Sequence, residues 1–350
     1  MNIKQDTLFI GLGNCGCKIT KLFADLGYSA MFANGSAQDL KVIGSQKGVY
    51  KLNGYDGFGG HREKAMECLC ANVDFTTALE DIPHSIIFIV YASGGSTGSG
   101  LSSVVAQYLM DVYGTDKTIC MCPVLPNVKE DTNKLWNGYQ VGAELSEMDG
   151  LGATFFIDNN SGEDLKQINR TFVKVLNGYL TDDTWSDTNN FDGAERMELL
   201  REQGAMIISY SDRQYKILED LLHGSIFAPL EGDQVVGKFG IIHGGKRDIS
   251  IDALIAEVGK PFNVFEGYGK NGTMIALSGL TFPYTRITEI GELAKKAQQE
   301  RQRNIEARKA HSLPSLDIMG MMQTTKKPEA QKPKRTGREA LMAMRSRMAN

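Results

Sequence analysis

The chain has 350 residues, a formal net charge of −4, 42% hydrophobic residues and 23% charged residues. This balance is typical of a protein that folds around a packed core, and the length is enough for two domains. No stretch reaches the roughly 18 uncharged apolar residues of a membrane-spanning helix, and the opening residues MNIKQDTLFIGLG lack the pattern of a signal peptide. We therefore expect a cytoplasmic protein without a membrane partner.

Short apolar runs alternate with amphipathic stretches over the first half of the chain. Strands are predicted at residues 7–13, 29–34, 84–92, 117–125 and 152–158, and helices at 15–27, 61–80, 101–114, 133–148 and 162–180. Repeated strand–helix alternation favours an α/β fold, with a parallel sheet that helices cover on both faces. Ligands of such sheets bind at the carboxyl ends of the strands, where two glycine-rich loops are predicted.

The first of these loops is GLGNCG, which matches G-x-G-x-x-G through Gly11, Gly13 and Gly16. After a strand and at the start of a helix, this pattern is typical of a dinucleotide site. The acidic residue that would hold the ribose about 20 positions further on is missing, and Asn34 ends the next strand. The loop therefore indicates phosphate at a helix N-terminus more strongly than it indicates NAD.

The second loop, GGSTGSG at residues 94–100, lies between a buried-type strand and an apolar helix. Glycines let successive backbone N–H groups approach an anion, and the helix dipole favours phosphate at the same place. No lysine follows the glycines, so the loop is not a Walker A loop. We interpret it as a phosphate-binding loop, against the alternative of a flexible solvent loop.

The second half of the chain begins with the polar stretch 181–193, which predicts a connection between domains. Strands are predicted at 205–210, 240–245, 261–269 and 273–280, and helices at 214–224 and 249–259. Residues 286–311 predict a long charged helix that lies on the surface. From Leu313 to Asn350, eight Lys or Arg face three Asp or Glu, a local charge of +5 that leaves −9 for the rest. This tail is expected to be disordered, and it either meets an acidic partner or only solubilises the chain.

Six cysteines form three C-x-C pairs: Cys15 and Cys17, Cys68 and Cys70, and Cys120 and Cys122. Zinc sites usually have wider C-x-x-C spacing and a second matching pair or histidines. We interpret the cysteines as small buried hydrophobic residues and predict no metal ligands among them.

The loop at 94–100 resembles the GGGTGTG signature of the tubulin and FtsZ GTPases, which bind GTP through several glycine loops without a Walker lysine. The resemblance spans the first 200 residues. NGSAQDL at 34–40 is similar to the NTDAQAL of FtsZ, with Ser36 where FtsZ has Asp, and GFGG at 57–60 suits the loop near the γ-phosphate. Pro126, Glu130 and Lys134 resemble P-x-x-x-E-x-x-x-R on the ribose side, with Lys in place of Arg.

The resemblance also implies the site residues. Asn169, nine residues before Gly178, would read guanine. The residues implied to bind nucleotide are Gly11, Gly13, Asn14, Cys15, Gly16, Asn34, Gly59, Gly60, Gly94, Gly95, Ser96, Thr97, Gly98, Ser99, Glu130, Lys134 and Asn169. The implied ligands are GTP or GDP with Mg²⁺ between the phosphates, and no protein side chain is assigned to the metal.

The stretch NNFDGAE resembles the catalytic loop N-x-D-x-x-[DE] of this family through Asn190, Asp192 and Glu195. Asn190, the first residue of this motif, lies 21 positions after Asn169, close to the family interval. In this family the acids reach the nucleotide of the neighbouring subunit in a head-to-tail filament, where they orient the attacking water. A head-to-tail contact that does not close produces an open filament.

Within the family, the long charged helix and basic tail resemble the TubZ branch, which segregates plasmid or phage DNA through a DNA-binding adaptor. The resemblance implies a Rossmann-like GTP-binding domain (1–162), a connecting helix (163–182), a smaller α/β activation domain that starts with the catalytic loop (183–285), a long helix (286–312) and a basic tail (313–350). Leu341, Met342, Met344 and Met348 of the tail would dock the adaptor, beside Arg345 and Arg347. Direct contact between the tail and DNA phosphates is the rival role.

Three other functions remain open at this point. A divergent FtsZ-like division protein has the same fold, but no DIPxFLR-like motif follows Leu313. An NAD-dependent Rossmann oxidoreductase would explain only GLGNCG. A non-hydrolysing structural homologue is disfavoured, because both Asp192 and Glu195 are present.

Overall fold

The computed structural model describes residues 3–44, 46–54, 56–162, 164–185, 191–211, 217–244, 249–270 and 272–310. The described strands form one sheet. They are β1 (Thr7–Leu12), β2 (Ser29–Asn34), β3 (Val49–Lys51), β4 (Ile86–Ala92), β5 (Thr118–Leu125), β6 (Ala153–Thr154), β7 (Ile157–Asp158), β8 (Thr184–Trp185), β9 (Gly204–Ser211), β10 (Lys238–His243), β11 (Asn263–Gly269) and β12 (Thr273–Leu280). Their order is β3-β2-β1-β4-β5-β6-β9-β12-β10-β11-β8, and β7 pairs with β5.

The described helices surround this sheet. They are α1 (Gly13–Asp25), α2 (Ala37–Leu40), a 3₁₀ turn η1 (Lys41–Ile43), α3 (Arg62–Leu69), α4 (Val73–Glu80), α5 (Ser96–Tyr113), α6 (Thr132–Ser146), α7 (Leu165–Thr181), α8 (Gly193–Arg201), α9 (Ile217–Leu222), α10 (Ile251–Val258) and α11 (Tyr284–Ala310). None of these described helices is long and apolar enough to cross a membrane.

The N-terminal half is a parallel sheet. β1 pairs in parallel with β2 and β4, and β4 pairs in parallel with β5. Every residue of β1 and of β5 is buried, as expected for strands that helices cover on both faces. All the carboxyl ends of these strands therefore meet at one edge of the sheet.

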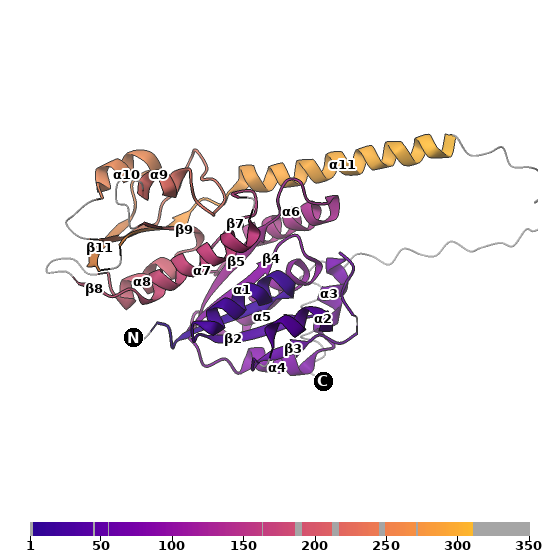
Figure 1. The fold of residues 1–350 in the computed structure, drawn as a ribbon, viewed down its shortest axis with the longest axis horizontal. Helices are drawn as coiled ribbons and strands as arrows, with labels where there is room; N and C mark the ends of the chain where they lie inside the picture. Colours follow the sequence, from indigo (N-terminus) through magenta and orange to yellow (C-terminus); the bar gives the residue numbers. More distant parts are fainter. Residues whose placement is uncertain are drawn as a thin grey trace, which may run out of the picture.

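The C-terminal half continues the same sheet with mixed pairing. β6 pairs in parallel with β9 through Ala153 and Gly204, and β9 then pairs antiparallel with β12. The long helix α7 runs between the two halves (Figure 1). One hydrophobic core runs through both halves, since most of their buried residues form a single contact cluster. A second, small cluster consists of Cys17, Phe32, Leu40 and Ile43.

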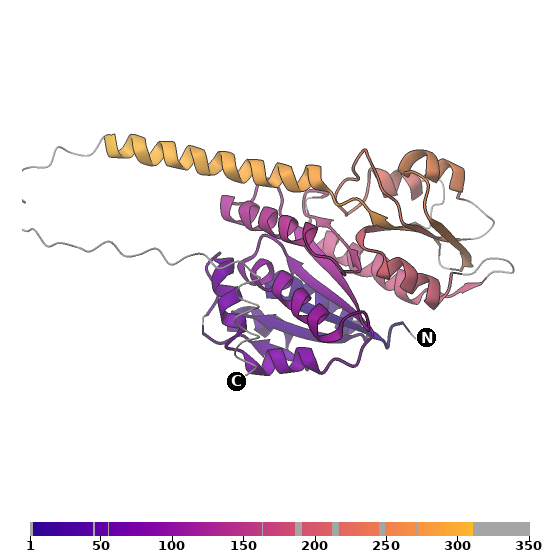
Figure 2. The ribbon, with the colours of Figure 1, turned by 180° about the vertical axis from the view of Figure 1, so that it is seen from behind.

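Helix α11 packs on α6 and then extends beyond the body of the protein (Figures 1 and 2). Its 27 residues correspond to about 40 Å at the usual helical rise. Close packing needs small residues, because a Cβ on Gly142 would lie 2.6 Å from Ile287, and one on Gly291 would lie 2.5 Å from Tyr139. The predicted surface position of this helix agrees with its exposed residues from Arg301 to Arg308.

Three local predictions were wrong. The single helix predicted at 61–80 is two helices, α3 and α4, because the chain turns at residues 70–72, where the Asn72 side chain donates to Cys68 O at 2.6 Å. The strand predicted at 152–158 is two short strands, β6 and β7. The loop predicted at 94–100 is already helical from Ser96 onward. The predictions for residues 313–350 lie outside the described residues.

Candidate nucleotide-binding site

The two glycine loops meet at the carboxyl edge of the parallel strands. GLGNCG joins β1 to α1, and GGSTGSG joins β4 to α5. A Cβ on Gly13 would lie 3.1 Å from the backbone nitrogen of Gly98, so the two loops are in contact. Gly13 has a φ of +74°, which glycine adopts without strain.

Both helices begin without a side-chain cap. Within the described residues, neither α1 nor α5 has a side-chain hydrogen bond at its N-cap or an acidic residue in its first turn. The first backbone N–H groups of both helices therefore have no acceptor of the kind that Ser, Asp or Asn supplies elsewhere. Two such N-termini side by side form a strong site for phosphate groups.

Glycine is required where α1 and α5 approach the strands. A Cβ on Gly16 would collide with the carbonyl oxygen of Val90, and one on Gly98 would lie 2.8 Å from the carbonyl oxygen of Ala92. Any side chain at either position would push a helix N-terminus away from the sheet. The glycines thus fix where the amides point.

Asn34 lies at the end of β2 and is 2% exposed. Its Oδ1 accepts from the Ser36 backbone N–H at 3.1 Å and from Thr97 Oγ1 at 3.5 Å. The amide therefore links the 34–40 loop to the first turn of α5. The structure brings Asn34 and Thr97 together, as the predicted site requires.

The loop at 57–60 lies against α6. The carbonyl oxygen of Gly60 accepts from Asn133 Nδ2 at 2.7 Å and from Asn137 Nδ2 at 3.2 Å. Gly59 and Gly60 have φ angles of +56° and +84°. Neither asparagine could be predicted from a local pattern, because Gly60 lies more than 70 residues before them in the chain.

Glu130 and Lys134 lie beside the second glycine loop. Their charged groups are 3.0 Å apart, and this hydrogen bond raises the pKa of Lys134. A Cβ on Gly94 would lie 3.1 Å from the Cβ of Lys134. Burial raises the pKa of the Cys15 thiol to about 11, with smaller effects from Lys18 and Glu130.

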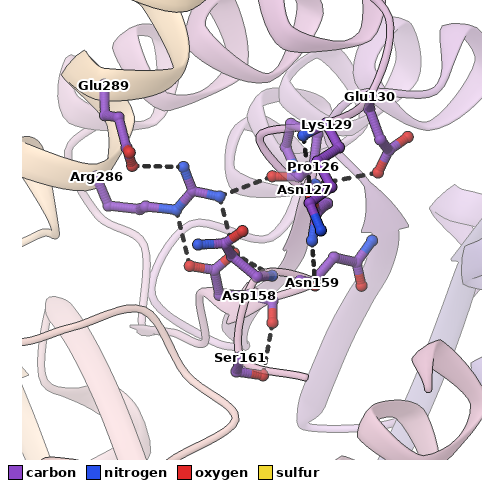
Figure 3. Close-up of polar contacts among 10 residues, drawn as sticks. Pro126, Asn127, Lys129, Glu130, Asp158, Asn159, Ser161, Arg286 and Glu289 are labelled. Carbon is purple, nitrogen blue, oxygen red and sulfur yellow. Dashed lines mark hydrogen bonds and ion pairs between the residues drawn. The ribbon is translucent and has the colours of Figure 1, made fainter. Parts of the chain in front are cut away.

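Figure 3 shows a polar network that includes Glu130 and connects its loop to Arg286 on α11. Arg286, on α11, donates from Nε to Asp158 Oδ2 at 2.8 Å and from Nη2 to the carbonyl oxygen of Pro126 at 2.8 Å. The Asn127 backbone N–H donates to Glu130 Oε1 at 3.1 Å. Arg286 was not predicted, and it fixes the start of the Glu130 loop.

Asn169 is half-buried on α7, which begins at the same edge of the sheet, after β7. Its Oδ1 is buried without a hydrogen-bond partner among the described residues. A buried acceptor without a partner is costly. This atom is free to accept a hydrogen bond from a bound base.

The predicted catalytic acids lie elsewhere. Asp192 caps α8 by accepting from the Ala194 N–H at 2.7 Å, and Glu195 Oε2 accepts from the Asp192 N–H at 3.0 Å. A hydrogen bond to the Glu195 carboxyl lowers the pKa of Asp192, whereas burial and then this same contact raise the pKa of Glu195. Asn190 lies outside the described residues.

Asp192 faces a cavity of about 620 Å³ at the opposite edge of the sheet. The cavity is also lined by Ile3 and Lys4, which precede β1, and by Leu26, which follows α1. The amino end of β1 is therefore the end near Asp192, and its carboxyl end carries the glycine loops. The acids and the glycine loops of one molecule cannot meet.

Magnesium was expected with the nucleotide. In the described part of the chain, no three His, Cys, Asp or Glu side chains gather as a ligand set. Asp39 Oδ2 accepts from Asn34 Nδ2 at 3.2 Å, and Asp56 Oδ1 accepts from the Ala37 N–H at 3.4 Å. Asp39, within the 34–40 loop, and Asp56, beside it, are too few for an all-protein cage, and they fit a Mg²⁺ that would take most of its ligands from phosphates and water.

The chain is similar to known proteins in sequence and in fold. No protein-family model matches the chain. The tubulin-like protein TubZ of Clostridium botulinum C phage is 23% identical over 312 residues, which are 85% of this chain and 86% of the relative. The crystal structure of Clostridium botulinum phage c-st TubZ matches with a TM-score of 0.71 at 22% identity, over 85% of this chain and 99% of that chain. The chain therefore has the tubulin/FtsZ-like fold, and its sequence is similar to that of TubZ over most of both chains.

The predicted tubulin/FtsZ-like α/β fold is confirmed by these matches. A third similar structure is the GTPγS-form protofilament of Bacillus thuringiensis serovar israelensis TubZ, with a TM-score of 0.72 at 14% identity over 86% of this chain and 95% of that chain. The similarity is to tubulin-like proteins, and it does not support the NAD-dependent oxidoreductase that GLGNCG alone allowed. The assignment of individual site residues stays a prediction.

Proposed function

We propose that this protein is a GTPase that polymerises head to tail, with each active site completed by the next subunit. The observation that carries the proposal is the separation of the glycine loops from Asp192 and Glu195 at opposite edges of one sheet. Stacking two copies end to end would bring the acids of one copy to the phosphates of the other. Such a contact uses different surfaces on the two copies and leaves both ends open, so it generates a filament.

The chemistry follows from this arrangement. Hydrolysis of GTP needs a water in line with the γ-phosphate and neutralised charge on the transferred group. The amides at the N-termini of α1 and α5 would hold the phosphates, and bound Mg²⁺ would neutralise their charge. Glu195, whose pKa is raised by burial, is the better proton acceptor of the two acids, and Asp192 would orient the water.

Guanine specificity rests on Asn169. Its buried Oδ1 has no partner among the described residues, and the N–H groups on the pairing edge of guanine would satisfy it. The resemblance implies the same role. GTP and GDP are therefore the proposed ligands.

The proposed biological role is segregation of plasmid or phage DNA. It is supported by similarity to a phage TubZ over most of both chains and by the local charge of +5 between Leu313 and Asn350. The tail would bind a DNA-binding adaptor, so DNA contact would be indirect, in the cytoplasm and without a membrane partner. A division protein of the same superfamily is the alternative, and recovery of septal anchors with the tail would favour it.

The first test is phosphate release from GTP over a range of protein concentrations, with polymer measured by sedimentation. We expect release only above a threshold concentration, because a single copy lacks a complete site. Glu195→Gln should form polymer without hydrolysis, whereas Glu257→Gln, an exposed carboxylate on α10, should behave like wild type. Strict proportionality between rate and concentration, without polymer, would contradict the shared site.

A further inference from the structure

Helix α6 holds the 57–60 loop and the second glycine loop together through one side chain. Asn137 is 3% exposed. Its Nδ2 donates to the carbonyl oxygen of Gly60 at 3.2 Å and to the carbonyl oxygen of Gly94 at 3.1 Å. The two hydrogens of a single amide nitrogen are thus shared between two loops that lie 34 residues apart in the chain.

The backbone next to Asn137 is held in place. A Cβ on Gly138 would lie 2.9 Å from Pro126 Cδ, so α6 packs directly against the end of β5. Pro126 in turn accepts a hydrogen bond from Arg286. Asn137 therefore donates from a fixed point, and the loops take their position from it.

The 57–60 loop is also held at both of its ends. Before it, the Gly57 N–H donates to Gly35 O at 3.1 Å. After it, Arg62 is 3% exposed and donates from Nη2 to Ser99 O at 2.7 Å and to Glu144 on α6 at 2.7 Å. Gly59 and Gly60 lie between these two ends. Their positive φ angles are accessible to glycine and strained for other residues. Asn137 and Asn133 hold the middle of the loop through the carbonyl oxygen of Gly60.

We propose that Asn137 is a positioning residue that makes nucleotide binding depend on the γ-phosphate. The inference rests on the proposed function. The N-termini of α1 and α5 are formed whether or not the 57–60 loop is in place, so they would bind the phosphates that GDP and GTP share. The 57–60 loop, held against Gly94 by Asn137, is the loop that the resemblance assigns to the γ-phosphate, so it would add the contact that GTP alone uses. Loss of the bridge should therefore weaken GTP and spare GDP.

The test measures the affinities of the full-length protein for GTPγS and GDP at concentrations below assembly. Asn137→Ala and the isosteric Asn137→Asp both remove the donors. Each should weaken GTPγS binding about tenfold, the scale of one or two buried hydrogen bonds, and GDP binding less than about threefold. Asn133→Ala is the comparison variant, because Asn133 donates to Gly60 but not to Gly94 among its described hydrogen bonds; it should change the ratio of the two affinities less than Asn137→Ala does.

Three results would overturn the inference. They are an unchanged affinity ratio in both Asn137 variants, an equal loss for both nucleotides, and variants that bind neither nucleotide, which would show that the amide is needed only for folding. A change of ratio in Asn133→Ala as large as in Asn137→Ala would assign the effect to Gly60 alone and reject the bridge. If wild type prefers ATP to GTP, the proposed function fails first, independently of Asn137.

Discussion

Replacing Arg286 by Met tests how strongly α11 is fixed to the nucleotide-binding half. The guanidinium and the Asp158 carboxylate are 5% and 4% exposed and are joined at 2.8 Å (Nε to Oδ2) and 3.1 Å (Nη2 to Oδ1). Arg286→Met leaves the Asp158 charge buried without its main partner and removes the donor to the Pro126 carbonyl. Breaking a buried pair in this way costs about 3–5 kcal/mol, a large share of the roughly 5–15 kcal/mol that stabilises a typical domain.

The assay is a double-mutant cycle followed by urea unfolding, with Arg286→Met, Asp158→Leu and the double variant. The double variant should be less destabilised than the sum of the single variants, because it leaves no unpaired charge in the core. Glu289→Gln is the control: Glu289 contacts the same guanidinium at 2.8 Å but is 50% exposed, so its loss should cost less than about 1 kcal/mol. A loss below about 1 kcal/mol for Arg286→Met, or strictly additive effects, would refute this account.

Three further predictions concern specificity and pH. Asn169→Ala should reduce the preference for GTP over ATP about tenfold in competition binding, since one hydrogen bond to the base is lost; an unchanged preference would exclude Asn169 as the guanine contact. Burial and then Lys117 lower the pKa of His84 below 6.5, so the folded state binds fewer protons than the unfolded state, and stability should fall as pH drops below about 6.5. The melting temperature of His84→Gln should fall less over that range, and an equal fall would assign the acid sensitivity to other groups. The pKa of Glu195 is raised above 4.5, so phosphate release should decline on acidification at a pH above 4.5. Asp192→Gln breaks the contact that helps to raise this pKa, so it should move the decline of any residual activity to lower pH. A decline at the same pH in the variant would reject Glu195 as the titrating group.

The strands and the positions of the two glycine loops could be predicted because their signals are local. Residues 29–33 are all apolar or small, and the strand ends at the polar residue Asn34. The glycines at 94–100 follow a buried strand directly, so the place of the loop at the edge of the sheet follows from the topology.

The parts that could not be predicted depend on distant partners. Asn137 and Arg62 are polar residues on helices, and nothing near them in sequence shows that they donate to backbone carbonyls of distant elements. The break at residues 70–72 was missed for a related reason, because the Asn72 side chain also accepts from the Asn53 backbone N–H, in a distant loop. Hydrophobic periodicity predicts which face of a helix is buried. It does not identify the hydrogen-bond acceptors that the polar side chains of that helix contact.

The continuous sheet limits how copies of this protein can associate. A sheet that runs through both halves has two open edges, β3 and β8 in the described part of the chain. β3 has three residues and β8 has two, so neither offers a length of unpaired backbone on which another molecule could add a strand. Sideways growth by strand addition is therefore disfavoured, and association is left to side-chain surfaces at the ends of the strands. Such contacts can break without unravelling a sheet, which suits the filament that we propose.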